Sequence, residues 1–173
     1  MKPLNKFPKK FFDKYKEKPV KLQKYSPGMR VLADKYVSLL NQMLAGQNAR
    51  VGVIGSVAYE IPTADVEVAV YTTKSNREAV INILESKFGQ PLQREKEFAR
   101  FEIPGEEWEL DIHVYSGYEA LVSEKLTKFM LANQRLIKEY ENLKQQSSFS
   151  RREYQYQKDL FLNRITESIP ENF

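Results

Sequence analysis

Two acidic residues separated by a single residue, Asp65 and Glu67, are the first feature of this sequence that could support chemistry. They lie at the start of a run, residues 66–72, in which valines alternate with other residues as in a half-buried β-strand. Side chains two positions apart on a strand point to the same side, roughly 6–7 Å apart along it. Two carboxylates on one face repel each other unless a cation lies between them, and Mg²⁺ prefers such oxygen ligands. The pair therefore predicts a magnesium site that suits a nucleotide's phosphates.

A glycine–serine pair precedes these acids. A short β-rich run, residues 50–54, ends at Gly55 and Ser56, and eight residues then separate Ser56 from Asp65. A turn of this kind has no side chain at the glycine, and it offers a hydroxyl and free backbone N–H groups at the serine. Because such turns can hold phosphate oxygens, the pair is a candidate nucleotide-binding element.

A third carboxylate comes from a later strand. Residues 98–103 and 108–115 are predicted to form a hairpin around Pro104-Gly105, with Asp111 and His113 on one face of the returning strand. If that strand lies beside the Asp65–Glu67 strand, three carboxylates could hold two metal ions that clamp the attacking and leaving oxygens of a phosphoryl transfer. Asp111 could instead act as a general base towards an acceptor hydroxyl.

Each of these features also has a plain structural explanation. Any half-exposed strand carries polar residues at alternate positions, and a Gly-Ser pair is a weak motif by itself. His113, the single histidine, could be a half-buried residue bonded to a neighbour. A catalytic triad of Ser56, His113 and an acid is disfavoured, because Gly55-Ser56-Val57 lacks the second glycine of a nucleophile elbow.

Composition restricts the class of protein. The 173 residues suffice for one domain with its own core. The absence of cysteine excludes disulfides, thiolate zinc sites and thiol nucleophiles, and it favours a reducing compartment. The longest apolar run, near residues 51–54, is too short to cross a bilayer, and the lysine-rich start lacks the apolar stretch of a signal peptide. We therefore expect a cytoplasmic protein without a membrane partner.

Positive charge is concentrated at the start of the chain. Residues 1–24 hold nine lysines and two acidic residues, a local sum of +7, so the remainder sums to −3 within the total of +4. The lysines alternate with aromatic residues, which is typical of an amphipathic helix or of a strap packed on the core. Because a nucleic-acid-binding domain would be basic throughout, nucleic acid is not the expected partner; an RNA-binding arm is the alternative.

Helices are predicted on both sides of the strands. Residues 29–43 have the three-and-four spacing of one apolar helix face, and residues 78–88 form a second such helix that ends at Gly89. From residue 116 the pattern stays helical to the end. Three helix starts carry a capping box, in which a serine is followed three positions later by a glutamate: Ser75/Glu78, Ser116/Glu119 and Ser150/Glu153. Strands followed by helices in this order predict an α+β fold.

The glycine–serine turn, the spacer and the acidic-x-acidic strand together resemble the signature of the nucleotidyltransferase superfamily. More specifically, residues 20–165 are similar to the GrpB family. The similarity includes the segments VKLQKYSPGM, IGSVA, IHV, LANQRLIKEYENLK and REYQYQKDLF, of which the last two are the most discriminating. The resemblance implies a nucleotidyltransferase-like mixed sheet flanked by helices. We expect a basic extension at 1–19, an α/β core at 20–115 and a helical segment at 116–173 packed on that core.

The resemblance and the residues together lead to a hypothesis of function: a Mg²⁺-dependent transferase that moves a nucleotidyl group from a nucleoside triphosphate to an unknown acceptor. The alternative is an inactive member of the fold that binds a nucleotide, a phosphorylated metabolite or a partner protein. In the GrpB family a lysine of the last helix corresponds to Lys158. Arg151 and Arg152 would neutralise phosphate if the terminal helices fold back over the cleft. The expected site comprises Asp65, Glu67 and Asp111 for metal and catalysis, Gly55, Ser56 and Lys158 for the nucleotide, and His113, Arg151 and Arg152 as further candidates.

Overall fold

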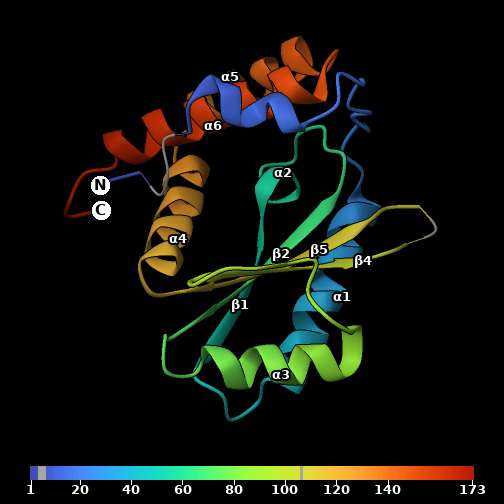
Figure 1. Ribbon diagram of the computed structural model, residues 1–173, viewed down its shortest axis with the longest axis vertical. Helices are drawn as coiled ribbons and strands as arrows, with labels where there is room; N and C mark the ends of the chain where they lie inside the picture. Colours follow the sequence, from blue (N-terminus) through green and yellow to red (C-terminus); the bar gives the residue numbers. More distant parts are fainter. Residues whose placement is uncertain (4–6, 106) are drawn as a thin grey trace.

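A five-stranded sheet separates two layers of helices in the computed structural model of the chain, which describes residues 1–3, 7–105 and 107–173 (Figure 1). The strands lie in the order β1-β2-β5-β4-β3. Their bounds are β1 Ala49–Ile54, β2 Val66–Thr72, β3 Gln93–Arg94, β4 Phe98–Ile103 and β5 Leu110–Ser116. The β2–β5 pair is parallel and the other pairs are antiparallel, so the sheet is mixed, as the resemblance implied.

One face of the sheet is apolar and covered by two helices. The helices α1 (Pro27–Met43) and α3 (Arg77–Phe88) pack below the sheet in the view of Figure 1. The alternating valines of β2 point to this side and are fully buried with their counterparts on β5, namely Val66, Val68, Val70, Leu110, Ile112 and Val114. Because side chains alternate along a strand, the remaining positions of β2 and β5 face the opposite layer.

The opposite layer consists of the three C-terminal helices, α4 (Gly117–Leu131), α5 (Gln134–Ser147) and α6 (Arg151–Ser168) (Figure 1). They share a second apolar cluster with the loop after β1, formed by Ile61, Met130, Ile137, Tyr140, Phe161 and Ile165. The predicted helical block is therefore confirmed. None of the described helices is both long and apolar enough to cross a bilayer.

The N-terminal segment, residues 7–24, forms a strap. A short 3₁₀ helix, η1 (Lys9–Lys14), lies on α6 with Phe12 buried beneath it. The strap then makes two backbone hydrogen bonds to the start of α6 and its loop, from Val20 N–H to Ser148 C=O (2.7 Å) and from Arg151 N–H to Lys18 C=O (2.7 Å). Of the two arrangements expected from its composition, the chain adopts the strap.

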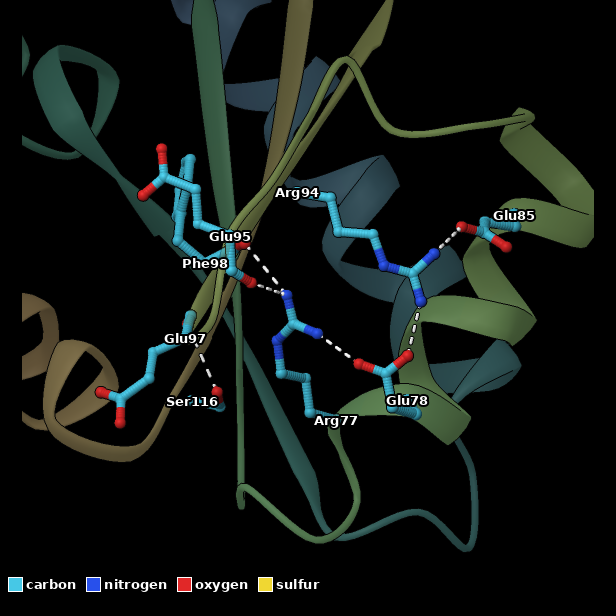
Figure 2. A network of polar contacts seen from close by, with 8 residues as sticks. All are labelled: Arg77, Glu78, Glu85, Arg94, Glu95, Glu97, Phe98 and Ser116. Carbon is cyan, nitrogen blue, oxygen red and sulfur yellow. Dashed lines mark hydrogen bonds and ion pairs between the residues drawn. The ribbon is translucent and has the colours of Figure 1, made fainter.

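The capping box predicted at Ser75 is wrong. The helix α3 begins at Arg77, and Ser75 lies before it, with its hydroxyl 3.1 Å from that of Thr73. Glu78 instead forms ion pairs with Arg77 and Arg94 (Figure 2). The helix start is thus held by a charged network rather than by a local cap.

Buried Arg77 extends this network to the β3–β4 hairpin. Its guanidinium donates to the backbone carbonyls of Glu95 and Phe98, the latter at 3.1 Å, as Figure 2 shows. A guanidinium has five donors in a rigid fork, so one arginine can satisfy several acceptors at once. Arg77 therefore fastens α3 to the outer strands of the sheet.

The other two capping boxes differ in outcome. Ser116 makes no capping bond at α4; the carboxylate of Glu97 takes that place and accepts from the backbone N–H groups of Tyr118 (2.8 Å) and Glu119 (3.2 Å). At α6 the cap is confirmed, because the hydroxyl of Ser150 accepts from the N–H of residue 153 at 3.4 Å.

Candidate functional site

The pairing of β2 with β5 places two of the predicted carboxylates side by side. Glu67 lies directly opposite Asp111 in the parallel register, and Asp65 precedes Glu67 by two positions on the same face. Neighbouring strands lie about 4.8 Å apart. The expectation that the two strands are neighbours is therefore confirmed, and all three acids belong to the sheet face that looks towards the C-terminal helices.

Gly55 brings the glycine–serine turn against this acidic face. It has φ +64°, a conformation that residues with a Cβ rarely adopt, and it opens the single helical turn α2 (Gly55–Ala58). A Cβ at this position would overlap the Oε2 of Glu67. Glycine is thus required for two reasons, its backbone conformation and the close approach of the Glu67 carboxylate.

A buried lysine that the sequence analysis missed holds the turn from the helical layer. Lys144 of α5 is 2% exposed, and its ammonium donates to the hydroxyl of Ser56 and to the carbonyl of Pro62 (2.6 Å). The pKa of Lys144 is lowered to about 8, first by burial and then by the neighbouring charge of Lys158, while Glu67 and Asp65 oppose the decrease. A sequence signal did exist, because Lys144 continues the apolar stripe of α5 at the i+3 and i+4 spacing.

Lys158, the lysine expected from the resemblance, lies in the same cluster. Its pKa is raised well above the usual range, first by the Tyr140 phenol and then by Glu67, Tyr154 and Asp65, whereas burial acts in the opposite direction. Burial also raises the pKa of Tyr140, so this phenol is neutral near pH 7. At that pH the carboxylates are the negative charges that act on Lys158, and the acidic pair is thus faced by a cation from α6.

Asp111 is engaged by a second residue that the sequence analysis missed. The guanidinium of Arg100, on β4, forms an ion pair with the Oδ2 of Asp111 at 2.9 Å and another with Glu102 at 3.0 Å. Burial raises the pKa of Asp111 to about 6, although Arg100 opposes the increase. The Oδ1 of Asp111 has no hydrogen-bond partner in the described part of the chain. One oxygen of the third predicted ligand is therefore paired with Arg100, and the other is buried without a partner.

His113 is a half-buried, neutral member of the same face. Burial lowers its pKa to about 3, with Lys158 and Arg100 adding to the decrease. Its Nδ1 lies 3.1 Å from the Tyr115 hydroxyl, and its Nε2 lies 3.9 Å from the Oδ2 of Asp111. The imidazole is therefore uncharged at neutral pH and forms no ion pair with Asp111. The hydroxyl of Ser56 contacts Lys144 instead of His113, so these two residues are not arranged as in a catalytic triad.

The two arginines at the start of α6 have different surroundings. Arg151 lines the cleft described below. Arg152 points to the strap, where it forms an ion pair with Glu17 at 2.7 Å and lies 3.8 Å from Asp13. The structure therefore brings Arg151, but not Arg152, to the candidate site.

A polar cleft of about 590 Å³ opens beside the acidic face. Its walls come from the strap, the loop before β2, the β4–β5 hairpin and α6. They include Asp65, Arg100, Arg151, Tyr154 and Lys158. Ligand pockets commonly measure about 300–1,000 Å³, so the cleft has the size of a small-molecule site.

The donor set suits one magnesium ion better than a three-carboxylate cluster. Within residues 1–3, 7–105 and 107–173, no three acidic, histidine or cysteine side chains lie close enough together to hold a metal ion as they stand. Burial and the charge of Glu67 raise the pKa of Asp65, which indicates that these two carboxylates interact. Mg²⁺ commonly binds one or two carboxylates and completes its shell with waters and substrate phosphates. Asp65 and Glu67 fit this pattern, while Asp111 is held by Arg100.

No protein-family model and no curated protein matches this sequence. Among solved structures, the chain is similar to the conserved protein GrpB from Enterococcus faecalis, with a TM-score of 0.68 and 18% identity over 86% of this chain and 96% of that one. It also resembles a chain of the GLD-2/RNP-8 complex, with a TM-score of 0.53 and 14% identity over 86% of this chain and 60% of that one. At such identities the likeness concerns the fold. The chain therefore has a nucleotidyltransferase fold of the kind seen in GrpB.

Proposed function

We propose that this protein is a magnesium-dependent nucleotidyltransferase. The observation that carries the proposal is the convergence of Glu67, Asp111 and the Gly55–Ser56 turn, which come from three separate segments and meet beside a polar cleft. A nucleoside triphosphate is the donor. The acceptor is a molecule that offers a hydroxyl to the α-phosphorus, and pyrophosphate leaves as the new phosphodiester bond forms.

The cationic side chains bind and orient the triphosphate. Lys158 and Arg151 line the cleft, and Lys144 lies behind Ser56. An ammonium or guanidinium forms strong charge-assisted hydrogen bonds with phosphate oxygens. When bound, Mg²⁺ would be held by Asp65 and Glu67, and it would supply charge neutralisation at the phosphates and at the leaving oxygen.

Asp111 accepts the proton of the acceptor hydroxyl. Its free Oδ1 and its pKa of about 6 suit a general base, because a pKa close to the working pH keeps most of the group ionised and still able to take a proton. Arg100 holds the other oxygen and so orients the carboxylate. His113, which is neutral and half-buried, lies beside Asp111.

A second candidate function is phosphate binding without turnover. It is favoured by the ion pair between Arg100 and Asp111, since a guanidinium already compensates the acid that a two-metal mechanism requires. In this case Arg100, Arg151 and Lys158 would bind a nucleotide or a phosphorylated metabolite through charge alone.

The two candidates differ in their dependence on metal. The thermal unfolding midpoint of the chain is measured with ATP, GTP, CTP or UTP, each with and without Mg²⁺. A transferase should show a Mg²⁺-dependent increase, because ligand binding to the native state stabilises it by mass action. The double variant Asp65→Asn/Glu67→Gln should abolish the increase, and Glu139→Gln, on the exposed face of α5, should retain it.

Radiolabelled pyrophosphate exchange into the triphosphate is the test of turnover. Exchange that requires Mg²⁺ and an acceptor extract, and that is lost in the double variant, would support the transferase. Stabilisation by triphosphate that is equal with and without Mg²⁺, together with no exchange, would favour the binding protein and refute the transferase.

A further inference from the structure

A second cavity, of about 440 Å³, lies on the same side of the sheet as the acidic cluster of Asp65, Glu67 and Asp111, but at the other end of the strands. Tyr115, four positions beyond Asp111 on β5, lies in its wall, roughly 13 Å further along the strand. The strap, the C-terminal helices α4 and α6, and the sheet enclose it. Nothing in the proposed transfer reaction uses this space, which we call the aromatic cavity.

Aromatic rings form much of its wall. Two come from the sheet, Phe98 and Tyr115, with ring centroids 5.3 Å apart. Three come from the strap, Phe7, Phe11 and Tyr15, and the first two are stacked at 3.9 Å. Aromatic rings carry a negative π face, so a cavity with rings on two sides suits a cation between them.

Negative charge exceeds positive charge among its described lining residues. Three carboxylates, those of Glu95, Glu119 and Asp159, face one ammonium, that of Lys14. Burial raises the pKa of Glu119, and the charges of Glu95 and Glu97 add to the increase. No hydrogen bond or ion pair among the described residues ends on the Glu119 carboxylate. The charge of Arg77 opposes this increase but does not pair with Glu119, so this half-buried acid has no direct counter-charge among the described residues.

The protein's own lysine already occupies one aromatic face. The Nζ of Lys14 lies 3.6 Å from the centroid of the Phe11 ring and 5.4 Å from that of Tyr15. An ammonium within about 6 Å of a ring centroid is attracted by the ring quadrupole. The side chain of Lys14 is exposed, so a ligand can displace it without disturbing the core.

We propose that the aromatic cavity binds a small organic cation, an alkylated or quaternary ammonium compound. The rings of Phe11, Tyr15, Phe98 and Tyr115 supply cation–π contacts, and Glu119 supplies the counter-charge. Lys14 competes for the same position. The site is independent of the proposed transferase, because none of its lining residues belongs to the acidic cluster or to the polar cleft.

Isothermal titration of the full chain with choline tests the proposal, with 3,3-dimethylbutan-1-ol as a neutral molecule of the same shape. Choline should bind saturably and about 10-fold more tightly than the alcohol, which corresponds to about 1.4 kcal/mol for the charge. Glu119→Gln should weaken choline binding by about 10-fold, and Lys14→Gln should strengthen it by about 3-fold, because a competing cation is removed. Glu139→Gln, outside the cavity, should leave the affinity unchanged.

The two cavity variants shift the affinity in opposite directions, so a general loss of folding cannot produce the expected pattern. Equal affinity for choline and the alcohol, or no saturation by choline up to about 100 mM, would overturn the proposal. Binding to phosphatidylcholine vesicles without binding of free choline would also overturn it, in favour of a lipid headgroup. Asp65→Asn/Glu67→Gln should bind choline as the unmodified chain does, which separates this site from the proposed transferase site.

Discussion

Replacing Lys144 with methionine removes the buried ammonium and keeps the length of the side chain. The ammonium has a pKa of about 8 in the folded protein against 10.5 for a free lysine. The folded state therefore binds fewer protons than the unfolded state between these two values. Stability of the unmodified chain must consequently increase as pH rises through this window.

The size of this increase follows from the same two values. The difference between the two pKa values corresponds to about 3 kcal/mol of unfolding free energy in total, of which about 2.5 kcal/mol should be gained between pH 7 and pH 10. Lys144→Met lacks this contribution. The difference in unfolding free energy between the unmodified chain and the variant should therefore change by about 2–3 kcal/mol in favour of the unmodified chain over that interval. Tyrosines and lysines remote from Lys144 titrate equally in both proteins, so their effects cancel.

Urea unfolding at pH 7, 8, 9 and 10, followed by circular dichroism, measures this difference. Lys144→Arg serves as the comparison, because its charge is retained at every pH and its contribution should not vary. A difference between the unmodified chain and Lys144→Met that stays constant within about 0.5 kcal/mol would refute the reasoning. It would mean that the Lys144 ammonium is as well solvated as in the unfolded chain.

Three further changes test other parts of the structure. Gly55→Ala should lower the unfolding free energy by about 2–3 kcal/mol. Gly46 also has a positive φ, +83°, but has open space around it, so Gly46→Ala should cost only about 1 kcal/mol. Urea unfolding compares the two variants. Asp111→Asn should flatten the pH dependence of stability between pH 4 and 6. The raised pKa of Asp111 stabilises the fold at pH values below the pKa of the unfolded chain, and this contribution is lost as pH rises through about 6. Equal slopes in both proteins would contradict this. Arg77→Met should cost about 1–3 kcal/mol, because it leaves the Glu95 carbonyl without a donor and removes one of the two donors to the Phe98 carbonyl, which keeps the N–H of Glu95. It should also speed hydrogen exchange at residues 93–98 before the rest of the sheet; uniform acceleration would count against the fastening role.

Local patterns were sufficient for most helices and strands. The spacing of apolar residues identified α1, the valine alternation identified β2, and Gly89, with φ +80°, ends α3 as expected. These features depend on neighbours within a few positions, which is the range over which sequence periodicity acts. The caps at Ser75 and Ser116 were wrong for the converse reason. Ion pairs from Arg94 and the carboxylate of Glu97, both distant in sequence, replaced the local serines.

The residues of the candidate site also fall into those that local spacing identified and those that it did not. The spacing of Gly55, Ser56, Asp65 and Glu67 was readable because these residues lie within one strand–turn–strand unit. Of the two missed residues, Arg100 is an ordinary member of a strand by pattern, whereas Lys144 is marked only as a charged residue within the apolar stripe of α5. Their importance arises only from what they contact. Magnesium binding and turnover remain predictions from the residue types.

The sequence by itself determined the elements, the glycine–serine turn and the presence of carboxylates on one strand face, because backbone preference and side-chain alternation are local properties. Tertiary structure alone decided that β5 pairs with β2 in the register that sets Asp111 opposite Glu67, that α5 inserts Lys144 behind Ser56, and that Arg100 neutralises Asp111. Charges act through space and become strong only where burial excludes water. Which charges meet is therefore settled by how the layers pack.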